Sequence, residues 1–111
     1  MKTTETMESS DPMIVRFTED EIRLMHLALD RWGLNTQIGQ TVEECAELIV
    51  ALQKYSNRSP QPESIDNIID EIIDVEMMLA QLRIAFNVDD DTFRKGIAQK
   101  FARLSEYLRQ G

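Results

Sequence analysis

The 111-residue sequence has one cysteine, one histidine and no long apolar run. A single cysteine, Cys45, excludes an internal disulfide, and we therefore expect the reducing environment of the cytoplasm. No apolar run approaches the ~20 residues that span a bilayer, which predicts that the chain has no membrane partner. The opening residues MKTTETMESSDP lack the apolar core of a secretory signal, so we expect no such leader.

Basic residues are also scarce, with 12 Lys and Arg against 20 Asp and Glu and a net charge of −8. This balance argues against a nucleic-acid polymer as partner, because a phosphate backbone is bound by clustered Lys and Arg. A small anionic ligand is compatible only where a cation or a local basic group offsets the acidic field. The Gly-x-x-x-x-Gly-Lys-Ser/Thr loop is absent, so phosphate would have to be held by a metal and side chains.

Apolar residues never alternate with a period of two, and the repeats of three and four residues predict helices. The length allows one domain, expected as an all-α antiparallel four-helix bundle over residues 17–111 that follows a mobile arm, residues 1–16. The predicted helices cover about 19–32, 36–57, 64–86 and 90–109.

Local signals mark the ends of these helices. The stretch TEDE has the form of a capping box led by Thr18. Gly33 is expected to end the first helix. The stretch RSPQPES, with two prolines, breaks the chain before the third helix, and Ser64 is expected to cap that helix.

Two of the helices carry acidic pairs in phase with their apolar rows. Glu44 and Glu47 in EECAE, and Glu71 and Asp74 in DEIID, are three residues apart and project from adjacent helix positions. The rise from Glu47 to the end of its helix is roughly 15 Å, and the rise from Ser64 to Glu71 is roughly 11 Å. Antiparallel helices joined by a short turn would therefore bring both pairs to nearly the same level.

Convergent carboxylates beside an apolar core repel one another and lose hydration, so they must take up protons or bind a cation. Four carboxylates without histidine or thiolate form an all-oxygen ligand set, which suits Mg²⁺, or Mn²⁺ in its place, better than zinc or copper. A lone Glu-Glu-x-x-Glu is usually a solvated helix face. Two pairs, both in phase with apolar rows and at one level, favour a metal site.

The EECAE and DEIID segments together resemble the Glu-x-x-Glu … Glu-x-x-Asp signature of the all-α NTP pyrophosphohydrolases, the MazG-like group, with 23 residues between Glu47 and Glu71. The longer stretches RWGLNTQIGQTVEECAELIVAL and NIIDEIIDVEMMLAQL look like bacterial and phage MazG-like proteins. KFARL is similar to the basic segment that closes the MazG catalytic domain. The likeness covers about residues 17–108.

The resemblance implies a Mg²⁺-dependent homodimer or homotetramer that cleaves a nucleoside triphosphate between its α- and β-phosphates, giving the monophosphate and pyrophosphate. Carried over by position, the metal ligands are Glu44, Glu47, Glu71 and Asp74. Glu47 and its neighbour Glu43 are the candidates to orient or deprotonate the attacking water. Glu43 fits a solvated surface residue equally well.

Candidate phosphate contacts are basic side chains near the acidic face. Lys54 lies seven residues after Glu47 on nearly the same side of its helix. Lys100 and Arg103 are assigned by similarity to the MazG basic segment. The alternative is that these are solvated charges that complement a helix C-terminus.

Candidate base and sugar contacts adjoin the acidic helices. Trp32 offers an aromatic face, and Gln37 and Gln40 offer amides in the segment that enters the first acidic helix. Asn67 lies four residues before Glu71 on the edge that carries the acids. Trp32 also completes an apolar stripe and fits a core residue, and Asn67 fits a residue at the start of a helix.

Two alternatives stay open. The first is a pyrophosphohydrolase of the same fold that is specific for dCTP/dUTP or for phosphoribosyl-ATP, which a substrate panel distinguishes. The second is a non-enzymatic helical interaction module whose acidic edge binds a basic partner. This module would show no Mg²⁺-dependent rise in melting temperature.

Overall fold

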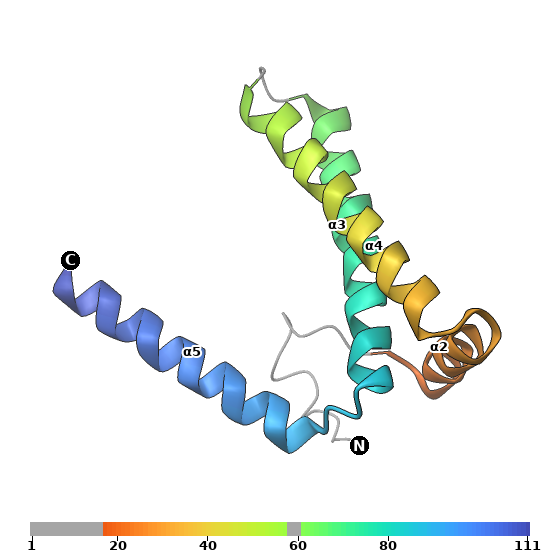
Figure 1. Cartoon of the computed structure of the whole chain (residues 1–111). Helices are drawn as coiled ribbons and strands as arrows, with labels where there is room; N and C mark the ends of the chain where they lie inside the picture. The colour runs from red at the N-terminus through yellow and green to blue at the C-terminus, as the bar shows by residue number, and fades with distance from the viewer. Residues whose placement is uncertain (1–16, 58–60) are drawn as a thin grey trace, which may run out of the picture.

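A computed structural model of the chain describes residues 17–57 and 61–111. This part is all-helical, with four helices and no strand, which confirms the predicted class. The helices are α2 (Glu19–Trp32), α3 (Leu34–Asn57), α4 (Pro62–Ala85) and α5 (Asp90–Gln110) (Figure 1). None of the four is long and apolar enough to cross a membrane. The predicted arm, residues 1–16, lies outside the described residues.

The helix ends follow from local chemistry. Thr18 caps α2: its hydroxyl accepts the N–H of Glu21, whose carboxylate accepts the N–H of Thr18, as the sequence predicted. Gly33 ends α2 with φ at 87°, a conformation that suits glycine. The predicted Ser64 cap is wrong, because α4 begins at Pro62. The fixed φ and missing N–H of proline suit the first helical position, so Ser64 lies within the first turn.

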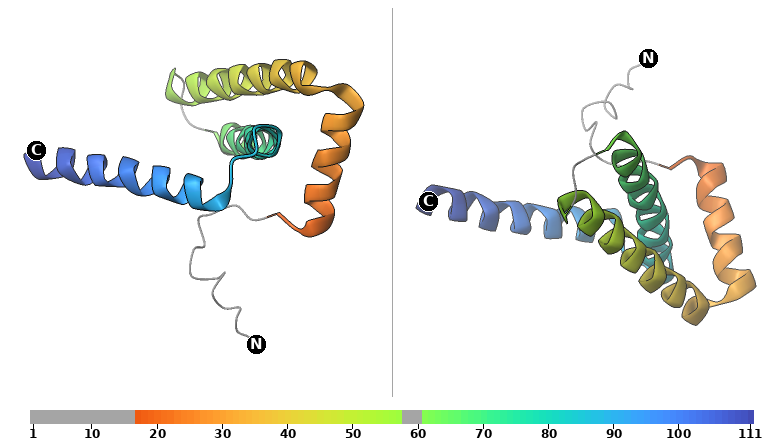
Figure 2. Two further views of the ribbon diagram at one scale, coloured as in Figure 1. Left: turned by 60° about the horizontal axis from the view of Figure 1, so that its bottom comes forward. Right: turned by 90° about the horizontal axis from the view of Figure 1, so that it is seen from above.

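The helices α3 and α4 lie side by side and form the main contact of the described fold (Figures 1 and 2). Ala51 of α3 and Val75 and Met78 of α4 are buried apolar residues of this pair. Gln37 and Gln81 are buried as well, and Gln37 Nε2 donates a 2.7 Å hydrogen bond to Gln81 Oε1. Because the two amides bond to each other, their burial avoids most of the desolvation penalty of a lone polar group.

One end of the α3–α4 pair is covered by α2, which contacts both helices (Figure 2). Met25 is the buried residue of α2. Only Gly33 separates α2 from α3, so the packing of α2 also determines where α3 begins. This short connection places the start of α3 beside the end of α4.

A hydrogen-bonded turn joins α4 to α5. The N–H of Val88 donates to the carbonyl of Arg83 at 2.9 Å, and the N–H of Asn87 donates to the carbonyl of Ile84 at 3.1 Å. These two bonds form the Schellman pattern of a helix C-terminus. Asn87 takes its left-handed position, with φ at 53°, which Asn tolerates better than most residues. The turn therefore has a defined shape.

After this turn α5 makes few contacts with the other described helices. Asp89 caps α5 by accepting the N–H of Thr92 at 2.7 Å. Arg83 lies 3.7 Å from the centroid of the Phe93 ring and 3.5 Å from the carboxylate of Asp90. Beyond these contacts α5 extends away from α3 and α4 (Figures 1 and 2), and none of its residues is buried.

Candidate metal centre

Three carboxylates from two helices converge on one edge of the α3–α4 pair. Glu44 and Glu47 of α3 and Glu71 of α4 each offer one oxygen, and these three oxygens lie within 4.8 Å of one another. We call these residues the acidic cluster. The spacing of three residues puts Glu44 and Glu47 on one side of α3, and the pairing of the two helices brings Glu71 to their level.

Two members of the cluster carry a buried oxygen that has no partner. Oε1 of Glu44 and Oε1 of Glu71 are shielded from solvent and accept no hydrogen bond. The second oxygen of Glu44, Oε2, accepts a 2.7 Å hydrogen bond from Nε2 of Gln40, which holds this carboxylate in place. A shielded carboxylate oxygen without a donor is unfavourable, so a bound cation would stabilise both groups.

Mutual repulsion and desolvation raise the pKa of two cluster members above the ordinary 4.5. For Glu47 the largest cause is the charge of Glu44, followed by desolvation and the charge of Glu71. For Glu71 the largest cause is desolvation, followed by the charges of Asp74 and Glu44. The raised pKa values mean that the cluster resists its full negative charge, and a cation between the carboxylates would remove that resistance.

The remaining predicted acids lie beside the cluster. Asp74, the fourth predicted ligand, is exposed and lies outside the group of oxygens within 4.8 Å. Glu43 is exposed and is the smallest of the charges that raise the pKa of Glu47. The structure therefore brings together three of the four predicted ligands and surrounds them with further negative charge.

The donor set of the cluster fits a hard divalent cation. All three groups are carboxylates, and Glu44 and Glu71 each have an oxygen that accepts no hydrogen bond. Mg²⁺ and Mn²⁺ prefer oxygen ligands, and Mg²⁺ is commonly held by one or two carboxylates together with substrate phosphates. The arrangement can thus bind a divalent cation and, through it, a phosphate.

The predicted base and sugar contacts are found in different surroundings. Gln40 bonds to Glu44 of the cluster, while Gln37 is buried against Gln81. Asn67 is exposed, one turn before Glu71 on α4. Trp32, at the end of α2, is 57% exposed and so is not a core residue of the single chain.

The predicted phosphate contacts do not meet the acidic cluster within one chain. Lys54 is exposed in the last turn of α3, two turns beyond Glu47. Lys100 and Arg103 are exposed on α5, which contacts α4 through Arg83 at its start but does not pack along α3 or α4 in the described residues.

The sequence interpretation assigned Gln40 to a base or sugar contact without its bond to Glu44, and it missed Gln81. The hydrogen bond from Gln40 to Glu44 has the i, i+4 spacing that favours such pairs on a helix, so the sequence carried a signal for it. Gln81 lies within an apolar stretch of α4, and its buried bond to Gln37, 44 residues earlier, left no local signal.

Comparison of the chain with protein-family models, with curated proteins and with solved structures finds no match. The likeness to MazG-like proteins therefore rests on the residues quoted above.

Proposed function

We propose that this protein is a Mg²⁺-dependent nucleoside triphosphate pyrophosphohydrolase of the MazG-like type, which converts an NTP or dNTP to the monophosphate and pyrophosphate. The observation that supports this most is the acidic cluster, with three carboxylate oxygens within 4.8 Å and two shielded oxygens without partners. The proposal places the enzyme in the cytoplasm. Its bundle is antiparallel and is completed in a homodimer or homotetramer.

Each residue near the cluster has a role in this proposal. Glu44, Glu47 and Glu71 hold Mg²⁺, with Asp74, one turn along α4, as the fourth ligand. Bound Mg²⁺ would offset the charge of the triphosphate and increase the acidity of a coordinated water. Glu43, an exposed residue one turn before Glu47 on α3, accepts a proton from the attacking water. Gln40 is a positioning residue, because it acts through the carboxylate of Glu44.

The activity test is a substrate panel. The full chain is incubated with each common NTP and dNTP and Mg²⁺, and the products are separated. We expect monophosphate and pyrophosphate in equal amounts. Release of orthophosphate would contradict the proposed bond cleavage. A preference for dCTP and dUTP, or activity only on phosphoribosyl-ATP, would identify the narrower enzyme of the same fold.

Two near-isosteric substitutions connect the activity to the cluster. Glu44→Gln and Glu71→Gln should each abolish turnover and the Mg²⁺-dependent rise in melting temperature, while circular dichroism shows an intact fold. Asp66→Asn, which changes an exposed acid elsewhere on α4, should behave as wild type. Wild-type protein with neither turnover nor a melting response to Mg²⁺ would instead favour the interaction module with an acidic edge.

A further inference from the structure

The helices α4 and α5 meet at a joint that no backbone hydrogen bond of the described residues crosses. The bonds that close α4 reach as far as Val88, whose N–H donates to the carbonyl of Arg83 at 2.9 Å. The bonds that open α5 begin at Asp89, which accepts the N–H groups of Thr92 and Phe93. The soft dihedrals between Val88 and Asp89 can therefore change without breaking a hydrogen bond of either helix end.

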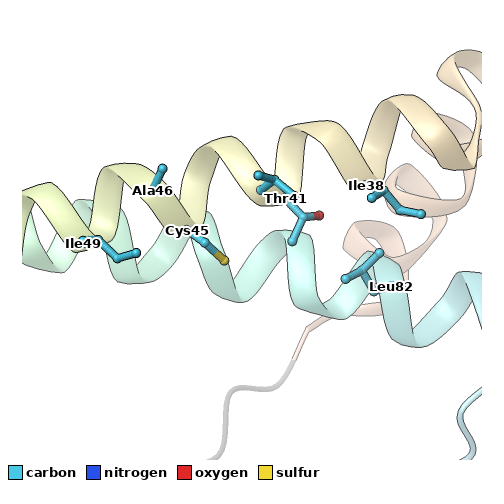
Figure 3. A pocket seen from close by; sticks show the side chains of 7 residues that line it. Ile38, Thr41, Cys45, Ala46, Ile49 and Leu82 are labelled. Carbon is cyan, nitrogen blue, oxygen red and sulfur yellow. The ribbon is translucent and has the colours of Figure 1, made fainter.

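The last turn of α4 is itself held in place by α3. Gln81 is buried and accepts the 2.7 Å hydrogen bond from Gln37. Figure 3 shows Leu82 facing Ile38 of α3 in an apolar groove of about 430 Å³. Arg83 follows directly after these two residues of α4, so its backbone has a fixed position relative to the α3–α4 pair.

The side chain of Arg83 extends from this fixed turn across the joint to α5. Its guanidinium carbon lies 3.7 Å from the centroid of the Phe93 ring, and Nη2 lies 3.5 Å from Oδ1 of Asp90. We call these three residues the clamp. Among the hydrogen bonds, ion pairs and ring contacts of the described residues, these two connect α4 directly with α5. Because α5 has no buried residue and does not pack along α4, its direction depends on the clamp.

The ring contact is the stronger part of the clamp. The carboxylate of Asp90 is 98% exposed, and its 3.5 Å separation from Arg83 exceeds the about 2.7–2.9 Å of a charge-assisted hydrogen bond, so this ion pair is weak. The side chain of Arg83 is only 38% exposed, and its Nε is shielded from solvent without a hydrogen-bond partner. A partly desolvated cation over the face of an aromatic ring is held more strongly than an exposed ion pair.

We propose that Arg83 is a positioning residue, which sets the direction of α5 by holding Phe93 against the last turn of α4. The helix α5 has 21 residues and acts as a lever. Lys100 and Arg103 lie about 15 and 20 Å from its start, so a swing of about 20° at the joint moves them by about 5–7 Å. This goes beyond the proposed function, because the direction of α5 is set whether or not the protein hydrolyses nucleotides.

Distances between spin labels, measured by pulsed electron paramagnetic resonance, test the clamp. In a chain that carries Cys45→Ser, labelled cysteines replace the exposed residues Asp66 and Gln99 in one sample and Gln53 and Gln99 in another. Two pairs are used so that a swing of α5 in any direction changes at least one distance. Labelled chain is unfolded and refolded with an excess of unlabelled chain, so that distances within one chain dominate. The intact clamp should give a narrow distribution for each pair.

Substitutions separate the parts of the clamp. Arg83→Gln removes the cation and Phe93→Leu removes the aromatic face, and each should broaden or shift at least one distribution by about 5 Å, as expected for a swing of about 20°. Phe93→Tyr keeps the aromatic face and should retain the original distributions. Asp90→Asn should change them much less than Phe93→Leu, because the ion pair is weak. Arg94→Gln, at an exposed position of α5, is the matched control and should change nothing.

Two outcomes would overturn the proposal. The first is that Arg83→Gln and Phe93→Leu both keep the original distributions. The second is that Phe93→Tyr broadens them as much as Phe93→Leu does, because the aromatic face would then be irrelevant. Circular dichroism confirms that each variant folds, and the comparison at Phe93 is decisive even where Arg83→Gln does not fold.

A kinetic readout connects the clamp to the reaction, and this part rests on the proposed function. If Lys100 contacts the triphosphate, Arg83→Gln should raise KM more than it lowers kcat, because binding is lost in the ground state and the transition state alike. Lys100→Ala should then cost less in the Arg83→Gln background than in the wild type. Equal costs would show that Arg83 does not position Lys100. A protein without turnover would contradict the proposed function, while the distances would still decide the role of the clamp.

Discussion

Glu44 of α3 and Glu71 of α4 both have a partly desolvated carboxylate. Each has one oxygen shielded from water and without a hydrogen-bond donor. Neither residue could lie so in the middle of an apolar core, where no cation could reach it. They lie instead at the edge of the α3–α4 pair, in one cluster with the exposed Glu47. The cluster is therefore incomplete as a set of bare carboxylates and suited to a ligand that brings positive charge.

The pH dependence of stability should reveal the repulsion and desolvation within the acidic cluster. The pKa of Glu47 is raised mainly by the charge of Glu44, and that of Glu71 mainly by desolvation. The folded state therefore binds more protons than the unfolded state above the ordinary pKa of 4.5, so the metal-free protein loses stability as pH rises through the raised values. Mg²⁺ should stabilise the protein increasingly over the same interval. Denaturant unfolding at several pH values, with EDTA or with Mg²⁺, measures both trends.

A double substitution provides the control for this experiment. Glu47→Gln with Glu71→Gln removes both raised groups, and the metal-free stability should then depend less on pH above 4.5. Asp89 acts in the opposite direction, because its bond with Thr92 lowers its pKa below 3.8, so its contribution is lost only at lower pH. An unchanged slope in the double variant would show that other groups cause the effect.

Gln40 should matter for metal affinity through Glu44. Its side chain donates to Glu44 Oε2 at 2.7 Å and so leaves Oε1 as the free ligand atom. Gln40→Ala should weaken Mg²⁺ binding by about tenfold, the lower end of what partners of metal ligands contribute. Calorimetric titration with Mg²⁺ measures this, with Gln53→Ala on the exposed surface of α3 as the matched control. Equal affinities for the two variants would exclude a positioning role.

At the scale of the helices, the α3–α4 pair depends on a buried polar contact. Gln81→Met removes the acceptor of Gln37 and leaves a buried amide without a partner, which should reduce the free energy of unfolding by about 1–3 kcal/mol. Adding Gln37→Met should restore most of the loss, because no polar group is then left unpaired. Denaturant unfolding of the four proteins of this double-mutant cycle gives the coupling energy. Additive losses would show that the two amides act independently.

The helix ends show how far local chemistry determines an element. Thr18 and Gly33 were both identified from the sequence, since a capping box and a terminal glycine act within one turn. The prediction that Ser64 caps the helix was wrong, because serine and proline both suit a helix start and here lie close together. The helix α4 begins at Pro62, two residues before the predicted start. Proline suits this position because it has no backbone N–H that would need a partner in the first turn.

At the scale of the whole molecule, a single chain leaves much apolar surface in water. Phe101, Leu104 and Leu108 of α5 are exposed in the same chain as Ile38, Val42 and Ile49 of α3. In the described residues α5 contacts α4 through Arg83 at its start but does not pack along α3 or α4. If these apolar residues are buried only when chains associate, the folded state should become more stable as the protein concentration rises.

The melting temperature should therefore rise with protein concentration. If unfolding is coupled to dissociation, a tenfold increase in concentration should raise the melting temperature by roughly 3–5 °C. Phe101→Lys should melt lower and show no such dependence, whereas Ala102→Lys should follow the wild type. Calorimetry over a hundredfold range of concentration decides between these outcomes. A melting temperature independent of concentration in the wild type would show that folding does not require a second copy.

The sequence alone determined the helices and which edges of them carry acid. Capping, the period of 3.6 residues and the spacing of Glu44 with Glu47 and of Glu71 with Asp74 act over one or two turns, where the covalent chain already sets the geometry. Only the tertiary structure decided that three of these acids converge, that Asp74 stays outside their group, and that Gln40 supports the cluster. It also decided that α5 does not pack along α3 or α4 of the same chain in the described residues. These outcomes depend on how far each helix is rotated about its axis and on the direction of each turn, which arise from packing between residues distant in sequence.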